Sequence, residues 1–288
     1  MKELVIVSGK GGAGKTTVAA AFAALAKGAV FADADVDAPD LYMVLKPTIK
    51  GRTKFYGMKA AIKEDSKCVN CGKCLEACRF GAIDKSFAIH RDRCEGCAVC
   101  TIVCPVGAIW MSDRVVGEAY VSETRFGPMS HALLDPGQEA SGMLVSLVRE
   151  NARRLARESG RDTIIIDGPP GTGCPVIAAI GGTKMAIVVV EPTLSSIHDG
   201  RRMVDVARHF HVQASVLINK SDVNADNVMS VRKYCATEGI EVIGELPYDD
   251  VATRAIVEGR PVTEYPETTL AKALSTAWKR VEEMLNDR

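Results

Sequence analysis

The chain has 288 residues, enough for one large α/β domain and a small additional module. Its 36 basic and 36 acidic side chains give a formal charge of zero, so the composition implies no nucleic-acid partner. The N-terminus turns to Ser-Gly too early for a signal peptide, and no apolar run is long enough to span a bilayer. We therefore expect a cytoplasmic protein without stable membrane insertion.

A short apolar run at residues 3–8 is typical of a buried parallel strand, and the alanine-rich stretch 15–27 favours a helix. Between them lies Gly-x4-Gly-Lys-Thr, which in this context predicts a phosphate-binding loop because backbone N–H groups and the helix N-terminus face the phosphates. Lys15 is expected to reach the β- and γ-phosphates and Thr16 to bind Mg²⁺. The expected nucleotide-binding residues of the loop are Gly11, Gly12, Ala13, Gly14, Lys15, Thr16 and Thr17.

Carboxylates gather after the second predicted strand, residues 29–33. A carboxylate at such a strand end, beside a phosphate loop, can orient the attacking water or contact the water shell of the metal. By position, Asp35 is expected to orient the water, with Asp37 as the alternative and Asp33 as a support for the loop.

Eight of the ten cysteines form two similar runs. They are Cys68-x2-Cys71-x2-Cys74-x3-Cys78 and Cys94-x2-Cys97-x2-Cys100-x3-Cys104-Pro105, each followed by Gly-Ala-Ile and offset by 94 − 68 = 26 residues. The repeat resembles that of bacterial two-cluster ferredoxins, in which three thiolates of one run and the fourth cysteine of the other hold each [4Fe–4S] cluster. This resemblance assigns Cys68, Cys71, Cys74 and Cys104 to one cluster and Cys94, Cys97, Cys100 and Cys78 to the other. Zinc fits the spacing poorly, and thiolate ligands indicate a reducing cytosol.

Downstream, residues 46–62 are predicted to be an extended connector, 114–135 strands and turns, and 139–158 a helix. Strand and helix patterns then alternate to the C-terminus, which predicts a mostly parallel sheet covered by helices on both faces. We divide the chain into a first part of a nucleotide-binding domain at 1–62, an inserted cluster domain at 63–112 and a second part at 113–288.

Two later segments complete the predicted nucleotide site. Asp167 follows an apolar strand and begins Asp-Gly-Pro-Pro-Gly-Thr-Gly, where it is expected to hold Mg²⁺ through water while the Gly171 N–H senses the γ-phosphate. Asn219-Lys220-Ser221-Asp222 fits a base-recognition loop, and the segment Pro247-Tyr248-Asp249 is expected to form the other wall of the base pocket. The pattern Asn-Lys-x-Asp is typical of guanine-binding proteins, so Asp222 keeps GTP open as an alternative to ATP.

These motifs together resemble the MinD, ParA, Mrp/Nbp35 and nitrogenase iron protein superfamily of P-loop ATPases. The resemblance implies a SIMIBI/MinD-like P-loop fold with an inserted α+β ferredoxin-like domain. Lys10, in Lys-Gly-Gly-x-Gly-Lys-Thr-Thr, matches the additional lysine of the family's deviant Walker A motif, which crosses a dimer interface to the nucleotide of the partner. Cys174 lies 174 − 167 = 7 residues after Asp167, the offset of a cluster ligand in the nitrogenase iron protein, although a structural thiol fits as well.

The resemblance predicts a Mg-ATPase, active as a homodimer or as a heterodimer with a paralogue. Its nucleotide cycle would be coupled to two [4Fe–4S] clusters and would serve electron transfer to, or metal-cofactor assembly on, a partner protein. Some members of this group occur with small NifX/NifB-like metal-cofactor proteins, including those of the orange-protein complex. The alternative is a positioning or scaffold ATPase of the MinD/ParA type whose clusters sense redox state.

Overall fold

A computed structural model describes residues 1–138 and 142–287. The chain divides into two compact units, each described separately below. The first comprises Met1–Arg52, Ala119–Leu133 and Ala140–Arg288, and the second comprises Thr53–Glu118 and Leu134–Glu139. The predicted insert, residues 63–112, falls within the second unit.

A nine-stranded sheet organises the fold, in the order β11-β10-β9-β1-β8-β2-β7-β6-β3. Its pairs from β11 to β7 are parallel. The strands β10, β9, β1, β8 and β2 consist mainly of buried residues, most of them aliphatic, as expected for parallel strands that are covered on both faces; in the edge strand β11 only Ile243 is buried. The strands are β1 (Lys2–Ser8), β2 (Ala29–Asp33), β3 (Thr48–Tyr56), β6 (Val115–Thr124), β7 (Gly127–Leu134), β8 (Thr163–Pro170), β9 (Met185–Val190), β10 (Gln213–Ile218) and β11 (Glu241–Glu245).

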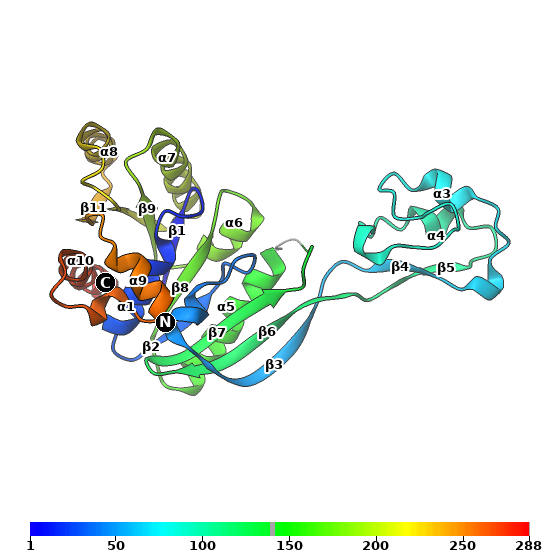
Figure 1. Cartoon of the computed structure of the whole chain (residues 1–288), viewed down its shortest axis with the longest axis horizontal. Helices are drawn as coiled ribbons and strands as arrows, with labels where there is room; N and C mark the ends of the chain where they lie inside the picture. Colours follow the sequence, from blue (N-terminus) through cyan, green and yellow to red (C-terminus); the bar gives the residue numbers. More distant parts are fainter. Residues whose placement is uncertain (139–141, 288) are drawn as a thin grey trace. The chain divides into compact units, whose positions relative to one another are not determined.

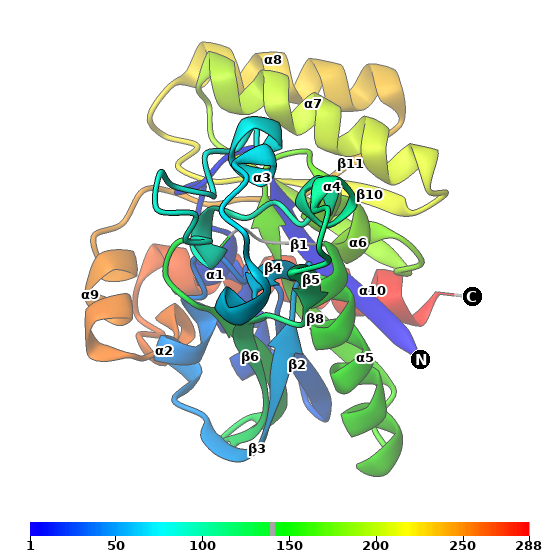
Figure 2. The ribbon, with the colours of Figure 1, turned by 90° about the vertical axis from the view of Figure 1, so that its right-hand side faces the viewer.

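Helices cover both faces of this sheet (Figure 1). Contacts place α1 and α10 on one face, and α5, α6 and α7 on the other. Helix α8 lies beside α7 in both views (Figure 2). The helices are α1 (Lys15–Leu25), α2 (Leu41–Leu45), α5 (Gly142–Glu158), α6 (Cys174–Ile180), α7 (Leu194–His209), α8 (Ala225–Glu238), α9 (Val251–Glu258) and α10 (Thr269–Asn286), with a 3₁₀ turn at Val262–Glu264.

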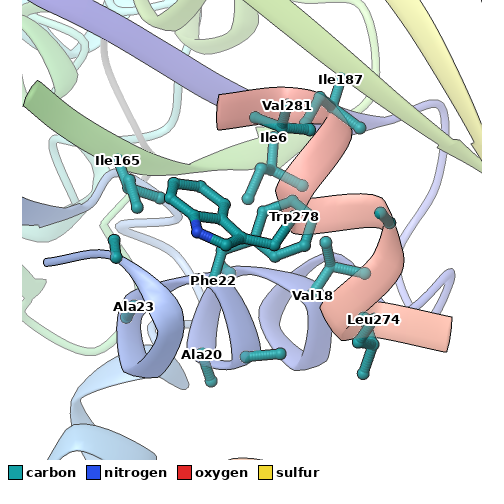
Figure 3. Close-up of a cluster of buried hydrophobic side chains, with 14 of the residues drawn as sticks. Ile6, Val18, Ala20, Phe22, Ala23, Ile165, Ile187, Leu274, Trp278 and Val281 are labelled. Carbon is teal, nitrogen blue, oxygen red and sulfur yellow. The ribbon is translucent and has the colours of Figure 1, made fainter. Parts of the chain in front are cut away.

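The core between the sheet, α1 and α10 centres on Phe22 and Trp278, whose ring centroids lie 5.2 Å apart (Figure 3). Small residues of α1, such as Ala19 and Ala23, are fully buried and let this helix approach the sheet closely. Because α1 begins at the end of the phosphate loop, this packing fixes the helix N-terminus that would face the phosphates.

The second unit contains a two-stranded antiparallel sheet of β4 (Ala60–Lys63) and β5 (Ile109–Ser112). Each cysteine run passes through one short helix, α3 (Lys73–Ala77) or α4 (Val99–Val103), and each is preceded by a 3₁₀ turn, Asp65–Lys67 or Arg91–Arg93. The sequence repeat is thus a structural repeat. Its core consists of a few aliphatic residues and cysteines.

One sequence expectation differs from the structure, and another falls partly outside the described residues. Residues 46–62, predicted to be a connector, contain β3 and the start of β4; their exposed lysines and threonines obscured a strand pattern at the sheet edge. The helix expected at 139–158 is described only from Gly142 as α5, since residues 139–141 lie outside the described part. Among the described residues, no helix is long and apolar enough to cross a membrane.

Candidate functional site

The phosphate loop joins β1 to α1 and is held by close backbone packing. Gly12 and Gly14 have positive φ angles of 79° and 94°, which L-residues with a Cβ rarely adopt. A Cβ on Gly9 would lie 2.1 Å from that of Asp199 on α7. The loop therefore needs glycine at Gly9 because a side chain there would clash with Asp199, and at Gly12 and Gly14 because of their positive φ angles.

Three acids converge beside this loop because β2 and β8 are parallel neighbours, with Asp33 directly opposite Asp167. The Lys15 Nζ lies 3.6 Å from Asp35 Oδ2, and both side chains are buried. Asp33 accepts a hydrogen bond from the Leu41 N–H at 3.1 Å, at the start of α2. Burial raises the pKa of Asp33 well above its usual range, and the carboxylates of Asp167 and Asp35 raise it further. The expected support role of Asp33 and the proximity of Asp35 to the loop match these contacts, whereas Asp37 is exposed.

Asp167 is fully buried, and neither carboxylate oxygen has a hydrogen-bond partner among the described residues. Burial raises its pKa to about 7; the Lys15 charge and the Thr16 hydroxyl, which approaches without a well-formed hydrogen bond, oppose that rise. A buried carboxylate without a partner is costly unless a cation compensates it. The donor set of Asp167 and Thr16 therefore fits a hard, oxygen-preferring ion such as Mg²⁺.

Gly171 of the predicted second switch and Lys10 of the phosphate loop both contact other parts of the chain. The Gly171 N–H donates to the Ser8 carbonyl at 3.1 Å, with Gly171 at a φ of 87°. The Lys10 Nζ lies 3.2 Å from Ser195 Oγ and 3.5 Å from Thr193 Oγ1, at the N-terminus of α7. To sense a γ-phosphate, Gly171 would have to release the Ser8 carbonyl.

The predicted base loop follows β10 and is tied to the phosphate loop. Asn219 donates through Nδ2 to the Ala13 carbonyl at 2.9 Å and accepts through Oδ1 from the Lys220 N–H at 3.0 Å. The Lys220 Nζ in turn pairs with Glu191 at 2.5 Å. A Cβ on Gly14 would meet the Asn219 amide at 2.3 Å, so the two loops are in direct contact.

A pocket of about 290 Å³ opens between these loops and α9. Asn219, Lys220 and Pro247 line it, as do Gly12 and Thr17 of the phosphate loop. Tyr248 and Asp249 also line it, so all three residues predicted for the other wall of the base pocket lie at this pocket. Asp222, by contrast, is not among the described residues that line the pocket.

In the second unit, each set of four cysteines surrounds its own hollow. One hollow is lined by Cys68, Cys71, Cys74 and Cys104, and the other by Cys78, Cys94, Cys97 and Cys100. These are the two sets that the ferredoxin-like repeat implies, each with its fourth cysteine from the other run. Among residues 1–138 and 142–287, no three His, Cys, Asp or Glu side chains converge as ligands of one metal ion.

Backbone N–H groups point at the sulfurs of these sets. Ala61 N lies 3.4 Å from Cys94 Sγ, and Ala108 N lies 3.3 Å from Cys104 Sγ. Burial opposes ionisation of Cys104, but the N–H groups of residues 106–109 outweigh it and lower the pKa of this thiol. Burial raises the pKa of Cys100, and the nearby Cys94, Cys97 and Cys78 add to that increase. Four thiols around a hollow, with N–H donors to sulfur, form a donor set that suits an iron–sulfur cluster.

The two remaining cysteines, Cys174 and Cys235, do not line either cysteine hollow. Cys174 is exposed at the start of α6, directly after the Asp167 segment. Cys235 is buried on α8, where burial raises its pKa to about 11 and makes it unreactive. His131, on β7 opposite Asp33, stacks between Tyr42 and Tyr120 with centroids 5.9 and 5.0 Å away. No spacing in the sequence indicated this stack, because its residues come from three separate elements.

The parallel sheet, the strand–loop–helix at residues 2–25 and the adjacent acids define a P-loop nucleotide-binding protein of the α/β class. The CobQ/CobB/MinD/ParA nucleotide binding domain model matches residues 4–262, and the chain belongs to this family.

Three individual proteins show how far the likeness extends. An uncharacterized protein of Methanocaldococcus jannaschii is 34% identical over 229 residues, 78% of this chain and 80% of its own length. An iron-sulfur cluster carrier protein of Pyrococcus furiosus is 25% identical over 94% of this chain and 82% of its own length. The structure of the septum site-determining protein MinD from Pyrococcus horikoshii, complexed with Mg-ADP, has a TM-score of 0.60, 17% identity and coverage of 99% and 97%. This structural likeness shows a MinD-like fold.

Proposed function

We propose that this protein is a dimeric Mg-ATPase whose nucleotide cycle is coupled to two [4Fe–4S] clusters. In this role it would transfer electrons to a partner protein or assemble a metal cofactor on it. The observation that carries the proposal is the pair of four-cysteine hollows in a chain that also has a complete phosphate loop. A nucleotide cycle and clusters in one chain suggest that one controls the other.

On the nucleotide side, Lys15 and Asp35 are paired before any phosphate arrives. When Lys15 turns to the β- and γ-phosphates, Asp35 loses its partner and becomes available to orient the attacking water. Asp167 and Thr16 would hold Mg²⁺, which neutralises the charge on the phosphate oxygens. A Gly171 N–H released from the Ser8 carbonyl would report the γ-phosphate.

Dimerisation would complete the site. In the family that this chain resembles, the lysine equivalent to Lys10 contacts the nucleotide of the partner. Here the Lys10 ammonium is held by two hydroxyl groups at the N-terminus of α7. Neutral hydroxyls are weaker partners for an ammonium than a phosphate is. Lys10 could therefore exchange them for a nucleotide across an interface at modest cost.

On the cluster side, the thiolates of Cys68, Cys71, Cys74 and Cys104 would hold one cluster, and the other set the second. A bound [4Fe–4S] cluster supplies one-electron redox chemistry, and N–H donors to sulfur such as Ala61 and Ala108 raise its potential. The similarity to an iron-sulfur cluster carrier protein supports a link to iron–sulfur chemistry. A small metal-cofactor protein of the NifX/NifB-like kind is the client that the resemblance implies.

A positioning or scaffold ATPase with redox-sensing clusters is the second candidate. It is favoured by the MinD-like fold along nearly the whole chain. The two functions differ in what ATP controls: release from a surface in the second, and reactivity of the clusters in the first.

The test combines iron content, nucleotide binding and cluster reactivity in anaerobically purified protein. We expect about eight irons per chain, and cluster reduction rates that change between nucleotide-free, ADP-bound and non-hydrolysable-analogue states. Lys15→Ala should abolish both nucleotide binding and that change, while Lys27→Ala, at the far end of α1, should leave both intact. Identical reduction rates in all three states, or zinc in place of iron, would refute the proposal; ATP-dependent attachment to membranes or DNA would favour the second candidate.

A further inference from the structure

The base loop and the segment after β11 are joined by three hydrogen bonds. The Ser221 N–H and hydroxyl both donate to the Leu246 carbonyl, at 2.8 and 3.2 Å. The Tyr248 N–H donates to Asp222 Oδ1 at 2.7 Å, a short charge-assisted bond. The loop therefore serves as the support on which residues 247–249 rest.

Asp222 takes part in this support through its Oδ1 atom. Of the base loop, Asn219 and Lys220 line the pocket, and opposite them lie Pro247, Tyr248 and Asp249. Asp222 does not line it in the described part of the chain. Selection of guanine by a carboxylate needs both oxygens directed at the N1–H and N2–H groups of the base. Here Oδ1 of Asp222 already accepts the Tyr248 N–H.

We propose that Asp222 is a positioning residue that holds the Pro247–Asp249 wall of the base pocket, and that it does not read the base. The inference rests on the proposed nucleotide site and deepens it. A base in this pocket meets the Tyr248 and Pro247 wall, which contacts any purine, so the pocket takes purine nucleotides without a carboxylate that selects guanine. The aspartate of the Asn-Lys-x-Asp pattern then has a structural role, the support of this wall.

The experiment measures binding of Mg-ADP, Mg-GDP and the magnesium complex of xanthosine diphosphate (XDP) to the full-length, cluster-loaded protein. The same measurements are made on its Asp222→Asn and Asp222→Ala variants. Xanthine carries a carbonyl where guanine carries the N2 amino group, so a base-reading carboxylate changed to an amide should exchange GDP preference for XDP preference. An amide oxygen can still accept the Tyr248 N–H. We therefore expect Asp222→Asn to keep all three affinities within about twofold, as should the control Asp226→Asn on the exposed start of α8.

Asp222→Ala removes the acceptor, and we expect it to weaken ADP and GDP by the same factor, about fivefold for one lost hydrogen bond. Amide hydrogen exchange at Tyr248 should accelerate in Asp222→Ala and stay slow in Asp222→Asn. A tenfold gain of XDP over GDP in Asp222→Asn, or loss of GDP alone in Asp222→Ala, would overturn the inference. If the wild-type protein bound none of the three nucleotides, the proposed function would fail first and this inference with it.

Discussion

At the scale of single residues, the nucleotide site is built from groups that are expensive to bury. Lys15, Asp35 and Asp167 are all less than a tenth exposed, and they share one corner of the sheet. Lys15 compensates Asp35, while Asp167 has no hydrogen-bond partner in the described part of the chain. Burying this carboxylate is costly, and a bound cation would offset that cost.

Changing Asp167 to Asn should therefore stabilise the nucleotide-free protein while removing Mg²⁺-dependent hydrolysis. The folded pKa of about 7 exceeds the unfolded value of 3.8, so the folded state retains a proton that the unfolded state has lost. Stability should fall as pH rises from about 4 to about 7, and Asn should remove that fall, a gain of about 4 kcal/mol at pH 8. Chemical denaturation of both proteins at pH 5 and pH 8 without Mg²⁺ measures it.

Asp226→Asn, at an exposed acid of α8, is the matched control and should change neither the stability nor the hydrolysis. A less stable Asp167→Asn protein at pH 8 would show that the carboxylate is compensated within the chain.

The sequence predicted the residues of the phosphate loop and of the two cysteine runs because the spacing within each motif is local. Lys15, Thr16 and the cysteine runs lie within short stretches whose geometry the backbone dictates. The role of Asp222 could not be predicted in this way. The same Asn-Lys-x-Asp pattern suits an aspartate that binds the base and one that supports a neighbouring segment. Only the position of Tyr248, 26 residues further on, distinguishes the two.

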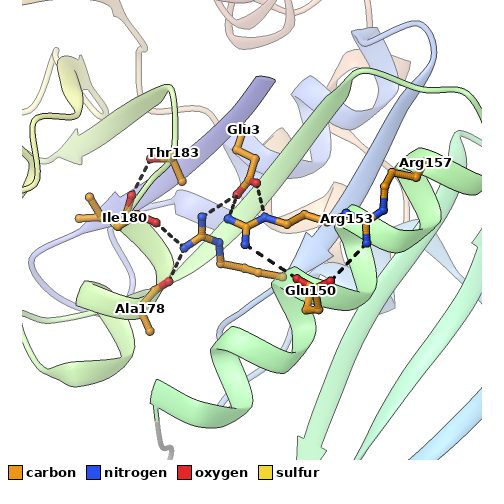
Figure 4. Close-up of polar contacts among 9 residues, drawn as sticks. Glu3, Glu150, Arg153, Arg157, Ala178, Ile180 and Thr183 are labelled. Carbon is orange, nitrogen blue, oxygen red and sulfur yellow. Dashed lines mark hydrogen bonds and ion pairs between the residues drawn. The ribbon is translucent and has the colours of Figure 1, made fainter. Parts of the chain in front are cut away.

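At the scale of elements, a buried ion cluster joins β1 to α5 and α6 (Figure 4). Glu3 accepts from Arg149 at 2.6 Å and from Arg153 at 2.5 Å. Arg149 also donates to the carbonyls of Ala178 and Gly181 at the end of α6, 2.5 and 2.8 Å away. Since β1 leads into the phosphate loop and α6 follows the Asp167 segment, this cluster fixes the elements that carry both motifs. The sequence analysis missed it, because Glu3 and Arg149 are far apart in the chain.

Glu3→Ala should destabilise the protein by about 3–5 kcal/mol, because it leaves the buried Arg149 guanidinium without its counter-ion. The measurement is the urea midpoint of unfolding. Glu150→Ala removes an exposed partner of Arg153 and Arg157 on the same helix and should cost less than about 1 kcal/mol. Equal losses in the two variants would mean that the buried cluster adds nothing beyond a surface pair.

At the scale of the whole molecule, the chain joins two units of different physical character. The first has a large aliphatic and aromatic core shared by the sheet, α1 and α10. The core of the second is small and is formed in good part by the cysteines themselves. A core of that size rarely sustains a fold without disulfides or metal, so the second unit should depend on its clusters.

Anaerobic removal of iron with a chelator should therefore unfold the second unit and leave the first intact. We expect the secondary structure of residues 53–118 to lose its hydrogen-exchange protection, while the amides of β1, β8 and α1 keep theirs. Basal ATP hydrolysis should stay within about threefold of the loaded protein, because the residues assigned to the nucleotide site lie in the first unit. Loss of nucleotide binding on chelation would contradict this separation, since it would make the clusters part of what holds the phosphate loop.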